Sequence, residues 1–203
     1  MSFDYLADPA AGPNWRGALP GRPEPYFLSQ GEGEHAMLFT DLFTVLLSGD
    51  ETGGQFGVFT SQAPSGQLIP AHTHHRTHEV FYIVAGSVQV YLQDHDGTKR
   101  SRLLTAGDFG FVPAGLVHAY QVHEPARILG VASGGFERFF QQMGQPTEHA
   151  SSEQPPFIPD FPRMAAAAQA HDMEFLPDFD WSGSQHGSGS QHGSGSQHGS
   201  GSQ

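Results

Sequence analysis

Several side chains that can bind a metal or carry a proton are crowded into the stretch GQLIPAHTHHRTHEVFYIVAG. Successive side chains of an extended strand point to opposite faces, so His72 and His74 leave the strand on the same face. Glu79 opens the next apolar run, in which Phe81 and Ile83 share its face. The pattern predicts that two imidazoles and one carboxylate converge on one interior point, where they could hold a metal ion.

Two further histidines, His75 and His78, have the wrong parity to join this group if the backbone is regular. Two interpretations of them stay open. In the first, both rings are exposed on the rim of the loop before Glu79. In the second, a titratable rim histidine helps to gate protons or to orient a substrate.

A second cluster lies in the stretch GDFGFVPAGLVHAY. Its Gly-Asp and Pro-Ala-Gly sequences predict two turns, after which His118 begins a strand. If this strand lies across from the first cluster, His118 supplies a fourth ligand. Three imidazoles and one carboxylate suit divalent iron, nickel, cobalt, copper, zinc or manganese rather than calcium or magnesium, and they leave positions open for catalysis. The alternative is that the histidines are merely packed or exposed and bind no metal.

The elements that must carry these residues are β-strands. Runs rich in Val, Ile, Phe and Tyr, separated by Gly, Pro or Asp, extend from Tyr26 to Ser133. The clearest hairpin is VQVYLQDHDGTKR, in which Val88, Val90 and Leu92 share a face and Asp-Gly supplies the turn. Many short strands with regular turn signals predict a sandwich or a small barrel. The predicted strands are Ala36–Leu47, Gln55–Ser61, Glu79–Ala85, Ser87–Gln93, Phe109–Val112, His118–Val122 and Arg127–Ala132.

After the strands the pattern becomes helical. FERFFQQMG predicts a short helix that ends at Gly144. RMAAAAQAHDM predicts a second helix, begun by Pro162 and favoured by alanine, that packs on the barrel exterior or on a neighbouring subunit. We therefore expect four regions: a Pro/Gly-rich arm (1–25), a β domain (26–144), a C-terminal helical extension (145–182) and a Gly/Ser/Gln/His tail (183–203).

Composition excludes several classes of function. Asp plus Glu is 21 against 9 for Lys plus Arg, so nucleic acid and anionic membranes are poor partners. The chain has no cysteine and hence no disulfide framework. The first residues lack the features of a signal peptide and no apolar run is long enough to span a bilayer, so we expect a soluble cytoplasmic protein. The GSQHGS tail, with His186, His192 and His198, is expected to be a flexible linker or tag that binds metal only loosely.

The first cluster resembles the first cupin motif. That motif is G, five residues, H-x-H, three or four residues, E, six residues, G. Here Gly66, His72, His74, Glu79 and Gly86 match it, and every spacing is met.

The second cluster resembles the second cupin motif, which is G, five residues, P-x-G, two residues, H, three residues, N. Here Gly107, Pro113, Gly115 and His118 match it, with Val122 where asparagine is usual. That asparagine is not a ligand in the family, so its loss affects packing at most. The resemblance implies an all-β cupin barrel (a double-stranded β-helix, or jelly roll) with short C-terminal helices, and one divalent metal held by the three histidines and the glutamate.

A wider likeness runs from about Pro25 to Gly144 and includes PYFL, HEVFYIVAGSVQVYL and GGFERFFQQMG. These stretches are similar to the single-cupin bacterial quercetin 2,3-dioxygenases. That family implies opening of the flavonol ring by dioxygen, with release of carbon monoxide and a depside, by a divalent metal such as Ni, Co, Mn, Fe or Cu and without an organic cofactor. It also implies that Glu79 acts both as ligand and as general base, and that the chain forms a homodimer.

A flavonol is flat and aromatic, so the rest of the pocket should be apolar. The inward-facing candidates for substrate binding are Phe81, Ile83, Phe111 and Tyr120, with Phe136 near the mouth. Other functions stay open: a cupin dioxygenase or oxidase acting on another enolic or catecholic substrate, a cupin sugar isomerase or epimerase, or a non-catalytic cupin that binds a small molecule.

Overall fold

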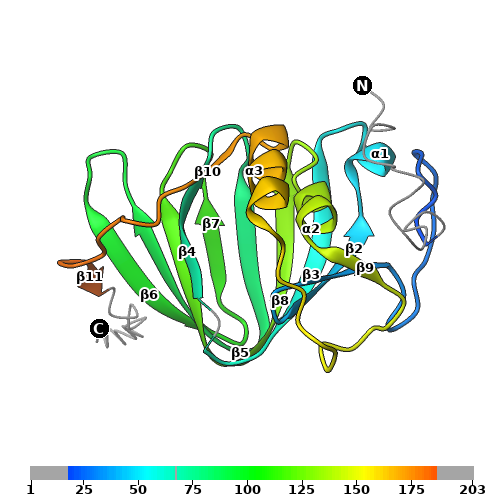
Figure 1. The fold of residues 1–203 in the computed structure, drawn as a ribbon, viewed down its shortest axis with the longest axis horizontal. Helices are drawn as coiled ribbons and strands as arrows, with labels where there is room; N and C mark the ends of the chain where they lie inside the picture. The colour runs from blue at the N-terminus through cyan, green and yellow to red at the C-terminus, as the bar shows by residue number, and fades with distance from the viewer. Residues whose placement is uncertain (1–17, 67, 187–203) are drawn as a thin grey trace, which may run out of the picture.

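The computed structural model describes residues 18–66 and 68–186 (Figure 1). In this part of the chain eleven strands form one hydrogen-bonded sheet, with the order β11-β6-β5-β8-β3-β2-β1-β9, and β4, β7 and β10 pair with it from the sides. The strands are β1 (Glu34–Leu38), β2 (Asp41–Leu47), β3 (Phe56–Ala63), β4 (Leu68–His74), β5 (Glu79–Gln93), β6 (Lys99–Thr105), β7 (Phe109–Val112), β8 (His118–Ser133), β9 (Gln145–Thr147), β10 (Met173–Phe175) and β11 (Gln185–His186). The helices are α1 (Gly49–Thr52), α2 (Glu137–Met143) and α3 (Phe161–Ala170). This arrangement confirms the all-β cupin fold.

Two long strands, β5 and β8, link the two halves of the barrel. The sequence predicted breaks at Gly86 and between Val122 and Arg127, and these predictions were wrong, because each strand bends without ending. Gly86 has a φ of +78°, and the register with β8 shifts around it. A Cβ at this position would lie 2.2 Å from the carbonyl oxygen of Pro125, so glycine allows the close approach of the two strands at the bend.

The first predicted strand, Ala36–Leu47, is two strands in the structure. The chain turns at Phe39, which has a φ of +54°, so that β1 and β2 pair with each other. Phe39 also exchanges two backbone hydrogen bonds with Phe157, in the C-terminal extension. The strands β4, β6, β9, β10 and β11 were not among the predicted strands, because their sequences are short, charged or rich in histidine.

The predicted hairpin is confirmed. Asp94 N donates to Thr98 O at 2.9 Å across the turn, and Val88, Val90 and Leu92 face the barrel interior together. The barrel core consists of the residues Ala63, Phe81, Ile83, Val88, Val90, Leu104, Val112, Leu116, Tyr120, Val122, Ala126 and Ile128.

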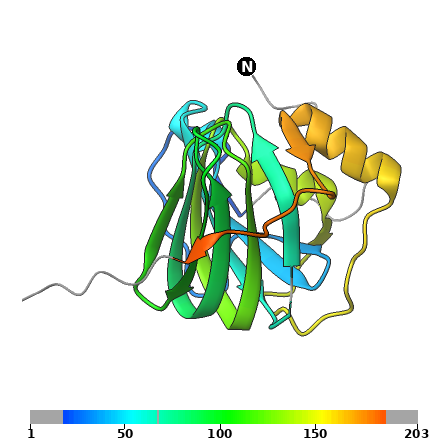
Figure 2. The ribbon, with the colours of Figure 1, turned by 90° about the vertical axis from the view of Figure 1, so that its left-hand side faces the viewer.

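A second apolar cluster lies beneath α2 and α3, which cover one side of the barrel (Figure 2). The ring of Phe43 on β2 stacks on that of Phe140 on α2, with the ring centroids 4.0 Å apart. Ala167 of α3 is fully buried in the same cluster. The second predicted helix therefore packs on the barrel exterior.

Glycine ends α2 as predicted, but for a different reason. Gly144 has a φ of −83°, so it does not use the left-handed conformation. A Cβ there would lie 2.6 Å from Phe140 O and 2.7 Å from Met37 O, so the residue must be small to let the chain pass β1. The second helix begins one residue before the predicted Pro162, because the Asp160 carboxylate caps it by accepting from Arg163 N at 2.9 Å.

Most of the predicted N-terminal arm and most of the tail lie outside the described residues. The tail was expected to be flexible from Gly183, yet Gln185 and His186 pair in parallel with Arg100 and Ser101 of β6. In Figure 1 the segment that leads there (orange) crosses from α3 to β6. Among the described residues, no helix is long and apolar enough to cross a membrane.

Candidate metal centre

Four buried side chains meet inside the barrel. His72 and His74 come from β4, Glu79 from the start of β5, and His118 from the start of β8. One ligand atom from each lies within 4.8 Å of the others. The carboxylate oxygen Glu79 Oε2 is 3.1 Å from His118 Nε2 and 3.4 Å from His74 Nε2. The structure thus brings the residues of both sequence clusters together.

Strand pairing explains how these four residues converge. His72 lies directly opposite His118 in the β4–β8 ladder, where their rings are 4.1 Å apart. His118 in turn lies opposite Leu92, near the end of β5. Because β5 runs through both halves of the barrel, its first residue, Glu79, faces the three histidines from the other half.

Backbone carbonyls fix the orientation of two of the histidines. His72 Nδ1 lies 2.7 Å from Pro70 O, and His118 Nδ1 lies 3.2 Å from Leu116 O. A carbonyl oxygen only accepts hydrogen bonds, so each Nδ1 carries a proton, and His72 Nε2 keeps a lone pair for a metal. His118 Nε2 faces the Glu79 carboxylate at 3.1 Å, where either a proton or a metal cation would bridge the two acceptors.

His74 is different. Both of its ring nitrogens are buried, and neither has a hydrogen-bond partner among the described residues. A buried polar group without a partner costs about 1–3 kcal/mol. A cation bound at His74 Nε2 would remove this cost, so the residues present fit a metal ion.

The electrostatics favour the protonation states that bind metal. Burial alone would raise the pKa of Glu79, but the imidazoles of His118 and His74 lower it below its usual range, so the carboxylate is ionised. Burial lowers the pKa of His72 well below its usual value, and the nearby His118 and His74 lower it further, so this imidazole is neutral. An ionised carboxylate and neutral imidazoles are the forms that ligate metals. The cluster is therefore a site for one divalent transition metal ion.

The two other histidines of the first cluster lie outside this site, as predicted. His75 has the opposite parity to His72 and His74, and His78 has the opposite parity to Glu79. His75 is exposed, with Nε2 3.7 Å from Glu174 Oε2. His78 is also exposed; its Nδ1 accepts from Ala114 N at 3.1 Å, and its ring stacks near that of Phe111. A role for either in gating protons stays a prediction.

Four of the five residues predicted to line a substrate pocket lie around the metal site. Phe81, Ile83 and Tyr120 face the barrel interior, and the Phe81 ring lies 6.4 Å from that of His118 and 5.9 Å from that of Tyr120. Phe136 is buried with its ring 4.2 Å from that of His74. Their contact with a substrate stays a prediction.

The expectation that Phe111 faces inward was wrong. In the β5–β7 ladder Phe111 lies opposite Val80, whereas Val112 lies opposite Glu79. Directly opposite residues share a face, so Val112 points inward and Phe111 points outward, where it is 50% exposed. The register of so short a strand is set by its partner, and nothing in its own sequence reveals it.

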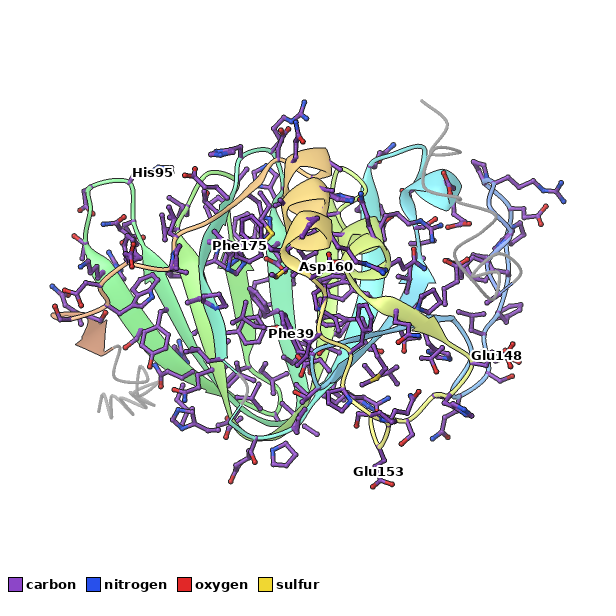
Figure 3. All side chains as sticks on the ribbon, in the orientation of Figure 1. Phe39, His95, Glu148, Glu153, Asp160 and Phe175 are labelled. Atoms are coloured by element: carbon purple, nitrogen blue, oxygen red, sulfur yellow. The ribbon has the colours of Figure 1, made fainter. Side chains whose placement is uncertain are left out.

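Two residues of the C-terminal extension that the sequence did not indicate lie near the site. Phe175 of β10, labelled in Figure 3, has its ring 6.3 Å from that of His72. His171 lies edge-on to Phe136, and its pKa is lowered to about 4 by burial and then by His74. The stretch was predicted to be helical through Met173, and a strand of three residues leaves too little pattern to be found.

Comparisons with known proteins place this site in context. Residues 59–132 match the cupin domain. Quercetin 2,3-dioxygenase of Bacillus subtilis (strain 168) is 31% identical over 166 residues, which cover 79% of this chain and 47% of that protein. Quercetin 2,3-dioxygenase of Aspergillus japonicus is 30% identical over 145 residues, which cover 69% of this chain and 41% of that protein. The chain therefore spans less than half the length of these relatives.

Among solved structures, oxalate decarboxylase from Bacillus subtilis at pH 4.6 matches with a TM-score of 0.47 and 20% sequence identity. The match covers 57% of this chain and 31% of that one.

Proposed function

Because the chain carries a cupin domain and resembles the quercetin 2,3-dioxygenases, we propose that it is a metal-dependent dioxygenase acting on flavonols such as quercetin. The reaction would open the heterocyclic ring with dioxygen and release carbon monoxide and a depside. The observation that carries the proposal is the buried cluster of His72, His74, Glu79 and His118 at the wall of an apolar barrel.

In this proposal the four clustered residues hold the ion. A bound divalent ion supplies Lewis acidity toward the 3-hydroxyl of a flavonol and lowers the pKa of that hydroxyl. Glu79 is the one carboxylate of the cluster, so it takes the hydroxyl proton as general base.

The walls of the barrel suit a flat aromatic substrate. The rings of Phe81 and Phe136 lie next to those of His118 and His74. Apolar walls exclude water, which would otherwise compete for the metal and protonate the flavonol anion. Ile83, deeper in the barrel, is fully buried and adds to the apolar lining.

The test is turnover of quercetin by protein loaded separately with manganese, iron, cobalt, nickel or copper. Loss of the flavonol absorbance, oxygen uptake and carbon monoxide are followed together. We expect stoichiometric carbon monoxide that disappears in Glu79→Gln and persists in the control Glu148→Gln, which changes an exposed carboxylate remote from the site (Figure 3). One metal per chain with no oxygen uptake in any preparation would reject the flavonol substrate and redirect the search to another enolic or catecholic compound.

We also propose that the chain forms a homodimer through the outer face of β5, β7 and β8. Tyr82 lies opposite both Phe109 and Leu129 in the two ladders, so the apolar residues of this face adjoin one another. Its exposed members are Tyr82, Val84, Phe109 and Phe111, and its half-buried members are Val80, Leu129 and Val131. No carboxylate stands at these seven positions, although the chain is strongly acidic. A contiguous exposed apolar patch of this kind marks an interaction site.

We propose a second copy as the occupant, since the resemblance to the single-cupin quercetin 2,3-dioxygenases implies a homodimer. Sedimentation at micromolar concentration should show a dimer. The double substitution Val84→Asp and Phe109→Asp should give a monomer that keeps its metal. A monomeric wild-type protein would reject the dimer.

A further inference from the structure

We propose that residues 172–176, here called the C-terminal clamp, position two of the four proposed ligands, His72 and His74, and so set the metal affinity of the site. The clamp contains β10 and lies in the C-terminal extension, far along the chain from both cupin motifs. The proposal rests on the metal site of the proposed function but does not depend on a flavonol substrate.

The ligand strand β4 is held loosely on its barrel side. It pairs there with β8 only at Leu68, Ile69 and His72, with a register shift between Ile69 and His72. No pairing with β8 extends to His74 among the described residues. On this side, His74 is held beyond the ladder by one backbone hydrogen bond, which Gly115 N donates to His74 O at 2.7 Å.

The clamp pairs with the opposite edge of β4 over the ligands themselves. Met173 lies opposite His74, and Phe175 lies opposite His72, in a ladder without a register shift. Figure 2 shows β10 (orange arrow) beside β4, next to α3. The ladder therefore gives His74 the in-sheet partner that β8 does not provide.

Hydrogen bonds close the ladder at both ends. His75 N donates to Asp172 O at 3.0 Å, just beyond the second ligand, and Leu176 N donates to Ala71 O at 2.8 Å, just before the first. On the outer surface Arg76 forms an ion pair with Asp172. The backbone that carries both ligands is thus hydrogen-bonded to the clamp immediately before His72 and immediately after His74.

The clamp is itself anchored to the barrel through α3. Arg163 Nε of α3 donates to Gln142 O of α2 at 2.8 Å. At the end of α3, His171 Nε2 lies 3.1 Å from Gln142 Oε1. The clamp cannot move away from β4 without disturbing these contacts.

The difference among the three histidines shows why the clamp matters most for His74. His72 and His118 are oriented by hydrogen bonds to backbone carbonyls, whereas His74 has no such bond. Its ring is placed by its backbone, by packing against Phe136 and the two other ligand rings, and by the Glu79 carboxylate 3.4 Å from Nε2. Loss of a group that orients a ligand typically weakens metal binding by about 10- to 100-fold.

The experiment removes one rung of the ladder without changing a buried side chain. The hydrogen bonds at Asp172 and Leu176 alternate along the clamp, so the Glu174 N–H also points at β4. Glu174→Pro deletes this donor. Glu174→Gln keeps the backbone donor and changes only the exposed side chain, so it is the matched control.

The readouts are the dissociation constant for Co²⁺ and the visible spectrum of the cobalt protein, measured without any substrate. We expect Glu174→Pro to bind Co²⁺ about 10- to 100-fold more weakly and with an altered spectrum, and Glu174→Gln to stay within about threefold of wild type. Ala167→Gly, on α3, controls for general loss of stability because it is destabilising but leaves the ladder intact. Folded Glu174→Pro with unchanged affinity and spectrum, or equal weakening in Ala167→Gly, would overturn the proposal.

A measurement on the wild-type protein covers the case in which Glu174→Pro does not fold. Because binding and positioning are linked, Co²⁺ should slow amide hydrogen exchange at His75 and Leu176. Exchange at these two amides that cobalt leaves unchanged would overturn the proposal. Failure of quercetin turnover alone leaves these tests intact, whereas failure of the wild-type protein to bind Co²⁺ would reject the metal site and the clamp together.

Discussion

Two buried polar clusters of this protein differ in whether their carboxylates are paired with a cationic side chain of the same cluster. Around α2, the Arg138 guanidinium contacts the carboxylates of Glu34 and Asp50, and Gln141 Nε2 donates to Glu34 Oε2 at 2.8 Å. The metal cluster instead gathers three imidazoles around Glu79. Among the described residues, neither ring nitrogen of His74 has a hydrogen-bond partner. Both clusters bury polar groups. The metal cluster differs from the Arg138 network because no cationic side chain in the described part of the chain lies beside its grouped ligand atoms.

The two clusters also differ in how they contribute to the stability of the fold. The Arg138 network joins β1, α1 and α2 directly, so it stabilises the structure without any further component. Asp41, which lies outside both clusters, is also buried and has one carboxylate oxygen without a hydrogen-bond partner in the described part of the chain. Among the described residues, no imidazole or guanidinium forms an ion pair with it. Substitutions in these three places should therefore have different consequences.

The largest effect is expected from removing a proposed ligand. His74→Ala should lower metal affinity by more than two orders of magnitude, because even the loss of a residue that only orients a ligand costs about 10- to 100-fold. The metal-free protein should lose only the packing of this buried ring, since His74 makes no hydrogen bond there. Metal analysis and chemical denaturation measure the two quantities. Retention of one tightly bound metal per chain would contradict the ligand assignment.

Arg138→Ala should lower the stability of the protein and leave its metal affinity unchanged. It leaves the buried Glu34 carboxylate without its cation, which typically costs about 3–5 kcal/mol of stability. Cobalt affinity of the protein that remains folded should be unchanged, because the network does not contact the metal ligands. Urea denaturation and cobalt titration check this, and a loss of metal affinity at constant stability would show that the two clusters are coupled.

Asp41→Asn should raise stability above neutral pH. Burial raises the pKa of Asp41 to about 7, so the folded state holds a proton that the unfolded state releases near pH 4. The wild-type protein should therefore lose stability as the pH rises from about 4 to about 7, by at most about 4 kcal/mol from this group. Denaturation of both proteins at pH 5 and pH 8 measures the difference. An equal pH dependence in the two would show that Asp41 is not the cause.

The smallest effect is expected at Phe111, which the structure places on the outside of the barrel. Phe111→Ala should change the stability of the protomer by no more than about 0.5 kcal/mol. Phe81→Ala, at the buried site, should cost about 3–5 kcal/mol. Denaturation of the two variants in the monomeric Val84→Asp/Phe109→Asp background compares them without the proposed interface. A large loss in Phe111→Ala there would contradict the observed register of β7.

Much of the proposed site could be predicted because the ligands follow local rules. His72 and His74 share a face in any extended strand, and the spacing to Glu79 and to His118 matches known motifs. The hairpin was predictable for the same reason, since turn residues act on their immediate neighbours. The end of α2 at Gly144 was also predicted, but its cause includes the close passage of β1, which is distant in sequence.

Features that depend on partners distant in sequence could not be predicted. The register of β7 against β5 decides that Val112 and not Phe111 faces the barrel interior, on the side of Glu79. The pairing of β10 with β4 joins residues about a hundred positions apart, and the sequence predicted a helix up to Met173. Neither segment is long enough for its own pattern to indicate its neighbour.

The sequence by itself determined which side chains meet: three histidines and one glutamate, on strands of an all-β barrel. Only the tertiary structure decided how their strands are held: the register that sets His72 opposite His118, and the pairing with β10 that fixes the strand of His74. The physical reason is the range of the interactions. Side-chain parity and turn geometry are set within a few residues, whereas register arises only when distant strands share hydrogen bonds.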